Sequence, residues 1–355
     1  MHRAFKGGAA ALAAVITVSA VIAPGPATAT PTNAPTTSSG ATGHGLSQTN
    51  LPVLVDAEAD LTANPDRSNE SWYLTAHVTA GGHRYAFVAH YVALGDAARG
   101  ASTSKVSITD ETTGWYTQSV LNLPARVGLS HAPGVDIRTQ NITWTGDTTK
   151  MTLHATVPEG QIDVTLRPRG PVLYNMGTGY FPMFADARYP NYEYALPTID
   201  TSGTLTLNGR TQKLHGQSWL DRQWGPLPAL GTGQTGWTWM GLSLSDGTRM
   251  SLWKTTSTTT NTWVTALAPN GTQTVTEATI TPDLSGTWTS PATHKTYPTR
   301  WTVTIPGLRT TLKVTATANN QELGSVLEAS ATVAGTYDGR RATGSSYVEV
   351  TNSLQ

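Results

Sequence analysis

The chain has 355 residues, with 23 basic residues balanced by 23 acidic ones, and charged residues make up only 13% of it. This length allows two domains of ordinary size or one large β domain, and the balanced charge gives no basic surplus for nucleic acid or an anionic membrane. Because the chain contains no cysteine, disulfides, thiol chemistry and a lipidated cysteine are excluded.

The N-terminus has the pattern of an export signal. Residues 1–6 are basic, residues 7–22 are small and apolar, and a small-x-small cleavage pattern ends at Ala29. Prolines shorten the apolar run to about 16 residues, below the roughly 20 needed to span a bilayer. We therefore expect residues 1–29 to be a signal peptide cleaved near Ala29, giving a secreted, extracellular protein without a stable membrane anchor. Residues 30–48, rich in Thr, Ser and Pro, are predicted to form a disordered leader.

From Leu51 onward the dominant pattern is the two-residue alternation of β-strands. Residues 51–64 are acidic and amphipathic and favour a short helix, whereas segments such as residues 83–94 alternate regularly. Hairpin turns are predicted at Asn208-Gly209, Pro306-Gly307 and Asp338-Gly339. Residues 171–197 are rich in Tyr, Phe, Met, Pro and Gly and are expected to form a long loop near a site or domain junction. Many short strands joined by turns predict an all-β fold.

The stretch of residues 215–247 contains four of the eleven tryptophans of the chain. If it forms two strands, alternation puts Trp219 and Asp221 on one face of the first strand and Arg222 on the other. In the second strand, tryptophans alternate with Met and Leu side chains that must be buried. We therefore expect these strands to be covered on both faces, as happens where two layers meet.

The aromatic stretch has three competing interpretations: plain core, a small-molecule cavity with aromatic walls, or a carbohydrate platform. Neighbouring tryptophans would raise the pKa of Asp221 by desolvation, which suits a proton donor, although a salt bridge or a turn cap is the alternative. Asp186, Glu193 and Asp221 are candidates for a glycosidase pair, but their spacing does not support one. The histidines are scattered without the spacing of metal ligands, so no metal site is expected.

Four blocks of this sequence resemble, in order, the hydroxyneurosporene synthase (carotenoid 1,2-hydratase, CrtC)/AttH family. They begin with "ESWY" at Glu70, "YEYALP" at Tyr192, "GWTW" at Gly236 and "YDGRRATGSSYVEVT" at Tyr337, and the second block includes "SWLDRQWG". The resemblance implies two lipocalin-like (calycin) antiparallel β-barrel domains packed side by side. We expect them to span residues 49–227 and 228–355.

The resemblance also has departures that bear on activity. Where the hydratases of the family have Asp-His-Glu-Trp, this chain has Asp-Arg-Gln-Trp from Asp221 to Trp224. Asp221 and Glu70 are the carboxylates that still match. Hydration of an alkene needs an acid and a group that positions water, so the loss of the neighbouring His and Glu argues against carotenoid hydration.

The first function expected is a secreted lipocalin-like protein that holds a hydrophobic small molecule of terpenoid or polyketide type in an aromatic cavity. The alternative is a cofactor-free hydratase, cyclase or isomerase, in which Asp221 is the acid and Glu70 and Tyr73 assist. A third is a carbohydrate-binding or glycoside-hydrolysing protein. No metal, cofactor or nucleic-acid partner is expected. The predicted ligand-binding residues are Trp72, Tyr180, Tyr192, Trp219, Trp224, Trp237 and Trp239.

Overall fold

A computed structural model describes residues 46–47, 51–95, 100–228 and 235–354. The predicted signal peptide and all but two residues of the predicted leader lie outside the described residues, so export stays a prediction. The described residues fall in one compact unit, Gly43–Gln355, and their regular secondary structure is almost entirely β-strand. The all-β prediction is therefore confirmed. None of the described helices is long and apolar enough to cross a membrane.

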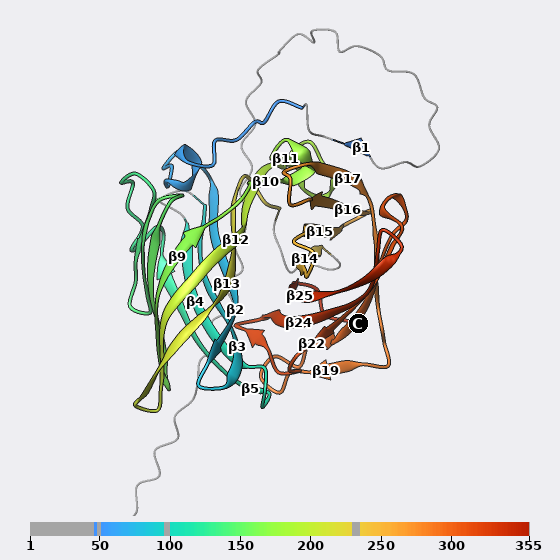
Figure 1. The fold of residues 1–355 in the computed structure, drawn as a ribbon. Helices are drawn as coiled ribbons and strands as arrows, with labels where there is room; N and C mark the ends of the chain where they lie inside the picture. The colour runs from blue at the N-terminus through green and yellow to red at the C-terminus, as the bar shows by residue number, and fades with distance from the viewer. Residues whose placement is uncertain (1–45, 48–50, 96–99, 229–234, 355) are drawn as a thin grey trace, which may run out of the picture. The chain divides into compact units, whose positions relative to one another are not determined.

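The first half of the unit is a 12-stranded antiparallel sheet, drawn from blue to yellow in Figure 1. Its strand order is β5 (Trp115–Pro124), β4 (Ala101–Asp110), β3 (His83–Leu94), β2 (Asn69–Ala80), β13 (Arg210–Trp224), β12 (Pro190–Leu207), β9 (Gly160–Pro168), β8 (Met151–Val157), β7 (Ile142–Gly146) and β6 (Val135–Arg138). Two short strands, β10 (Leu173–Tyr174) and β11 (Tyr180–Pro182), also pair with β12.

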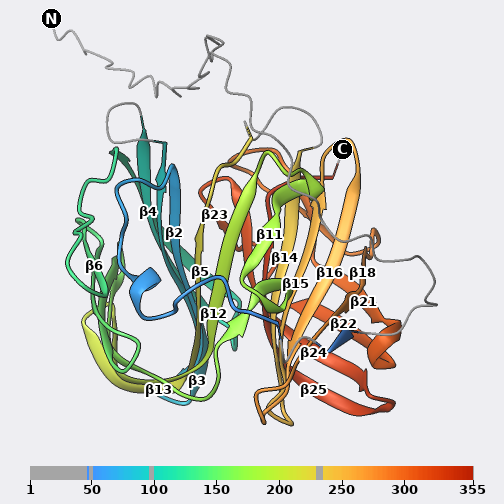
Figure 2. The ribbon, with the colours of Figure 1, turned by 90° about the horizontal axis from the view of Figure 1, so that it is seen from above.

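The second half is an 11-stranded sheet, drawn mainly in orange and red in Figures 1 and 2. Its order is β1 (Leu46–Ser47), β17 (Gln273–Glu277), β16 (Thr260–Leu267), β15 (Arg249–Thr256), β14 (Gly236–Leu244), β25 (Arg340–Val350), β24 (Val326–Tyr337), β22 (Thr310–Ala316), β21 (Arg300–Ile305) and β18 (Thr279–Pro282), with β23 (Glu322–Leu323) on β24. A small hairpin pairs β19 (Thr287–Thr289) with β20 (Thr296–Pro298). Leu46 and Ser47, at the end of the predicted leader, thus form a strand.

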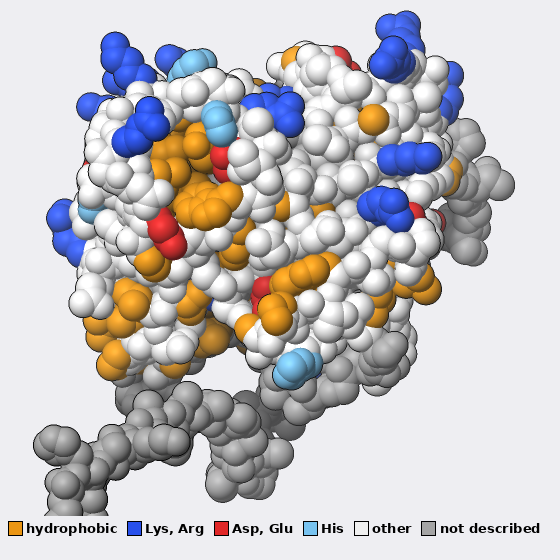
Figure 3. All heavy atoms as spheres, turned by 90° about the horizontal axis from the view of Figure 1, so that it is seen from below, with side chains coloured by type: hydrophobic (Ala, Val, Ile, Leu, Met, Phe, Trp, Pro, Cys, Tyr) orange, Lys and Arg blue, Asp and Glu red, His pale blue; other side chains and the backbone are white. Residues whose placement is uncertain are grey.

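Each sheet curls around its own apolar core into a near-closed barrel (Figures 1 and 2). In the first sheet the gap between its two edges is bridged by side chains. Asn141, which precedes β7, accepts a hydrogen bond of 2.6 Å from Ser104 Oγ on β4 and donates one of 3.2 Å to the carbonyl of Ser119 on β5. The predicted pair of barrel-like antiparallel domains is therefore confirmed as a fold class. Seen from below, hydrophobic side chains gather in a hollow over the first sheet (Figure 3).

The predicted hairpin turns form where the sequence places them. Asn208 and Gly209 have φ values of 49° and 77°, and Asp338 and Gly339 have 50° and 73°. Two consecutive positive φ values define the two-residue turn that matches the twist of the flanking strands, and Asn-Gly and Asp-Gly adopt it best. The third turn, η4 (Pro306–Leu308), joins β21 to β22.

Two local expectations are corrected by the structure. The helix expected within residues 51–64 is one 3-10 turn, η1 (Ala59–Leu61). The long loop expected over residues 171–197 contains two strands, the 3-10 turns η2 (Asn175–Gly177) and η3 (Met183–Ala185), and then the first part of β12. Its alternation is weak because this part of β12 is buried on both faces, and a strand covered twice needs no polar face.

The outer faces of the two sheets pack on each other through a third cluster of buried aromatic side chains. Trp219 and Trp239 meet edge to face, with ring centroids 6.1 Å apart. Trp253 and Trp263 stack at 6.0 Å. Strand β13 is consequently buried on both faces from Ser218 to Arg222, as the aromatic stretch predicted.

Candidate functional site

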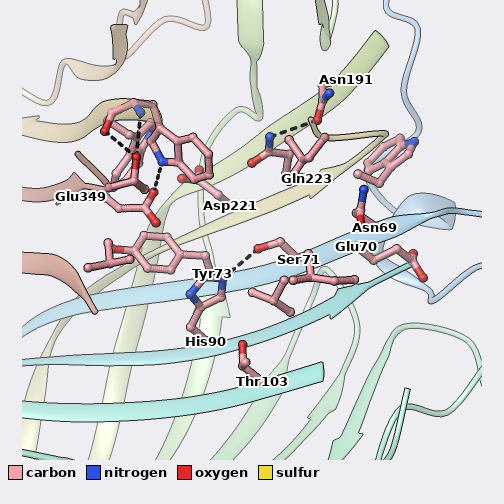
Figure 4. A pocket seen from close by; sticks show the side chains of 18 of the residues that line it. Asn69, Glu70, Ser71, Tyr73, His90, Thr103, Asn191, Asp221, Gln223 and Glu349 are labelled. Carbon is pink, nitrogen blue, oxygen red and sulfur yellow. Dashed lines mark hydrogen bonds between the residues drawn. The ribbon is translucent and has the colours of Figure 1, made fainter. Parts of the chain in front are cut away.

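A cavity of about 390 Å³ lies between the two sheets. Figure 4 shows side chains from both halves of the chain turned toward it. Its apolar wall is aromatic, and polar groups are placed at a few points on that wall, which is the usual composition of a small-molecule site. Its lining includes Tyr73, His90, Asp221, Gln223, Trp224, Trp237, Trp239 and Glu349.

Asp221 stands on β13, directly opposite Tyr73 of β2. The Nε1 group of Trp219, two residues earlier on the same face, donates a hydrogen bond of 2.5 Å to Asp221 Oδ1. Burial, reinforced by the charge of Glu193, raises the pKa of Asp221 well above its usual value. The desolvation predicted from the sequence is therefore present, and it favours the protonated form of Asp221.

Glu349 is a second carboxyl at the cavity, and the sequence analysis did not single it out. It lies on β25, opposite Trp239 of β14 and Glu328 of β24. Trp237 Nε1 donates to Glu349 Oε2 at 2.7 Å. Burial raises the pKa of Glu349, and burial with the charge of Glu349 raises that of Glu328. An acidic side chain within the apolar run of residues 347–350 is the signal that would have found it.

Two further acids, Glu328 and Glu193, belong to the same cluster of buried carboxyl side chains. Tyr73 Oη donates a hydrogen bond of 2.5 Å to Glu328 Oε2, which links β2 of one sheet to β24 of the other. Glu193 on β12 accepts a hydrogen bond of 2.9 Å from Asn175 Nδ2. Burial raises the pKa of Glu193 to about 8. The interface between the sheets thus holds several acids whose pKa values burial raises.

His90 is a candidate proton acceptor at the cavity, and the sequence alone did not identify it. It lies on β3 opposite Tyr73, and its ring meets the Tyr73 ring edge-on at 4.8 Å. His90 Nε2 is 3.0 Å from Ser71 Oγ, and Nδ1 has no hydrogen-bond partner among the described residues. Burial and the nearby Lys105 ammonium lower the pKa of His90 well below its usual value. The imidazole is therefore neutral and able to accept a proton.

Glu70 borders the cavity, but its carboxylate is already occupied. Arg222 Nη2 donates to Oε1 at 2.5 Å, and Arg126 Nη1 donates to Oε2 at 2.8 Å. Arg222 also stacks on Trp72 inside the first barrel, with Cζ 3.8 Å from the ring centroid. Arg222 and Asp221 face opposite sides of β13, as predicted, and the partner of Arg222 is Glu70. Figure 4 shows Glu70 turned away from Asp221 and His90.

The predicted ligand-binding residues divide into two groups. Trp224, Trp237 and Trp239 line the cavity together with Tyr73 and Asp221. The other four do not line it. Trp72 is fully buried in the first barrel, Trp219 packs behind Asp221, and Tyr180 and Tyr192 pack on each other with ring centroids 5.5 Å apart. In the described part of the chain, no group of three or more His, Asp or Glu side chains is arranged to hold a metal ion.

The buried carboxyls make stability depend on pH. Glu193 has a folded-state pKa of about 8 against an ordinary value of 4.5, so the unfolded chain binds fewer protons in that interval and stability falls as pH rises. We expect the free energy of unfolding, measured by urea titration, to fall between pH 5 and 8, with about 1.4 kcal/mol per pH unit from one fully titrating group. Glu193→Gln should flatten this slope. The exposed Glu277→Gln control should leave it unchanged, and an equal slope in Glu193→Gln would contradict the assignment.

Comparison with known proteins finds matches that cover most of the chain. The model of the AttH-like family matches residues 51–353. Dehydratase asqC of Emericella nidulans is 29% identical over 327 residues, covering 84% of this chain and 89% of that protein.

Two crystal structures share the fold. Kievitone hydratase of Nectria haematococca has a TM-score of 0.74 at 22% identity, covering 87% of this chain and 95% of that one. An AttH-type protein of Nitrosomonas europaea also has a TM-score of 0.74 at 22% identity, covering 86% and 99%.

Proposed function

This chain belongs to the AttH-like family, and from that premise we propose that it is a cofactor-independent hydro-lyase. It would add water to a small organic molecule, or remove water from one, in the cavity between the two sheets. The relatives named for these reactions, a dehydratase and a hydratase, favour an enzyme over the ligand carrier that the sequence analysis put first.

The observation that carries the proposal is that one cavity is lined both by carboxyls with raised pKa values and by an imidazole with a lowered pKa. Burial raises the pKa values of Asp221 and Glu349 and favours their protonated forms, while burial lowers the pKa of His90 and favours the neutral imidazole. Groups whose environments move their pKa values apart in this way can divide the roles of acid and base at neutral pH.

In the direction of dehydration, the Asp221 carboxyl gives its proton to the leaving hydroxyl, and the C–O bond breaks to release water. His90 takes a proton from the adjacent carbon, and the electron pair of that C–H bond forms the double bond. Return of the proton from the His90 imidazolium to the Asp221 carboxylate restores the starting state. Hydration is the same sequence reversed.

The remaining cavity residues fit roles in binding and orientation. Tyr73, fixed by its hydrogen bond to Glu328, lies in register with both Asp221 and His90 and would hold the reacting oxygen between them. Trp224, Trp237 and Trp239 would cover an apolar or aromatic substrate.

The test is turnover by the purified full chain in D₂O, with a panel of apolar tertiary and benzylic alcohols and the corresponding alkenes. We expect mass spectrometry to show gain or loss of one water, with solvent deuterium on the neighbouring carbon of the hydrated product. The rate should survive dialysis against EDTA. Compounds that copurify with the protein should be assayed in the same way, and their release unchanged, with no turnover of the panel, would support a carrier instead.

A further inference from the structure

A second cavity, of about 150 Å³, lies at one end of the interior of the second barrel. Strands β14, β15, β18 and β21 line it, and the residues after β25 lie across its end. Leu354 is held there by a hydrogen bond of 2.7 Å from its N–H to the Thr296 carbonyl. Its lining includes Trp237, Thr238, Lys254, Ile280, Trp301 and Val350.

Lys254 is the unusual member of this lining. Residues two apart on a strand share a face, so Lys254 continues the row of Met250 and Leu252, which are fully buried in the core of the second barrel. At the end of this row, Lys254 lines the cavity beside the apolar interior. The side chain is half-buried.

No described residue neutralises this ammonium. Lys254 makes no ion pair within the described part of the chain, and the cavity lining there contains no Asp or Glu. Its cross-strand neighbours are Thr238 on β14 and Thr262 on β16, which offer hydroxyls and no charge. A lysine that lines a partly apolar cavity, without an anion beside it among the described residues, can pair with a ligand that brings the anion.

We propose that this cavity is a second ligand site, which binds a small monocarboxylate. The carboxylate pairs with Lys254 and takes a hydrogen bond from Thr238, and the apolar body packs against Ile280, Trp301 and Val350. A cavity of about 150 Å³ accommodates a molecule the size of a benzene ring, so the ligand is of the size of benzoate. The charge of Lys254 and the volume of the cavity together indicate a small monocarboxylate as the ligand.

The site is distinct from the cavity of the proposed reaction. Trp237 lines both cavities and separates them, and its Nε1 group is bonded to Glu349 on the side of the reaction cavity. The two cavities also differ in their lining, because the carboxyls of Asp221 and Glu349 line the reaction cavity, whereas the described lining of the second contains no Asp or Glu. The inference therefore stands whether or not the protein is a hydro-lyase.

The test is calorimetric titration of the full chain with benzoate and with benzyl alcohol, its uncharged analogue. Loss of a charge-assisted hydrogen bond should weaken benzoate binding to Lys254→Met by about tenfold or more. Lys254→Arg should keep the wild-type affinity within about threefold, and benzyl alcohol should bind wild type and Lys254→Met equally. A crystal soaked with benzoate should show its carboxylate at Lys254.

Two control variants make the result decisive. Lys213→Met removes an exposed lysine of the first sheet and should leave benzoate binding unchanged. Lys105→Met removes a lysine that lines the reaction cavity. The proposal is overturned if wild type does not bind benzoate, if Lys254→Met binds it as tightly as wild type, or if Lys105→Met loses the binding instead.

Discussion

Replacing Asp221 with asparagine should lower kcat for water addition or removal by about 10²–10⁴-fold, the usual contribution of a positioned general acid. Asparagine keeps the size of the side chain, and its carbonyl oxygen still accepts the hydrogen bond from Trp219. The proton for the leaving hydroxyl is lost. We therefore expect KM to change little, and the measurement is steady-state turnover of the substrate found with the D₂O assay.

The matched control for this variant is Asp200→Asn. Asp200 lies on the neighbouring strand β12 and forms an exposed ion pair with Arg169, so the same chemical change is made away from the cavity. It should retain wild-type kcat and KM. Unchanged turnover in Asp221→Asn, with the control also active, would remove Asp221 from the mechanism and leave Glu349 as the candidate acid.

Replacing Arg222 with methionine should destabilise the protein by about 3–5 kcal/mol, because it leaves the Glu70 carboxylate buried without its closest cation. Arg222 and Glu70 both have fully buried side chains. Arg222 also donates hydrogen bonds to the backbone carbonyls of Asp60 and Thr62, at 2.8 and 3.2 Å, which tie the η1 segment to the barrel. Urea titration of the free energy of unfolding measures the loss.

A second substitution separates the buried charge from the other contacts. In the double variant Glu70→Gln/Arg222→Met the unpaired carboxylate is gone, so part of the lost stability should return. Arg169→Met is the surface control, because its pair with Asp200 is exposed and should contribute no more than about 1 kcal/mol. Equal stability of Arg222→Met and wild type would show that Glu70 is not held as described.

Local sequence patterns predicted much of the architecture. Alternation predicted the strands and assigned Asp221 and Arg222 to opposite faces of β13. The Asn-Gly and Asp-Gly pairs predicted two hairpins, because positive φ values are accessible to few residues. The same reasoning was wrong for residues 171–197, where burial on both faces removes the polar positions that make alternation visible.

The candidate site was predicted only in part. Asp221 was found because tryptophans flank it in sequence, so its desolvation could be read locally. His90, Glu328 and Glu349 each occur in ordinary strand segments, and nothing in those segments reveals which strand lies opposite or which sheet covers them. Glu70 illustrates the converse, because the structure pairs this matching carboxylate with Arg126 and Arg222, and its assisting role stays a prediction.

The sequence by itself determined the all-β class, the turns, and which side chains share a strand face, since these depend on residues a few positions apart. The tertiary structure alone decided that Asp221 of the first sheet and Glu349 of the second lie at one cavity with His90. It also decided in which direction their pKa values are shifted. A pKa depends on burial and on neighbouring charges, and at this site the burial comes from the packing of two sheets whose strands lie more than a hundred residues apart in the chain.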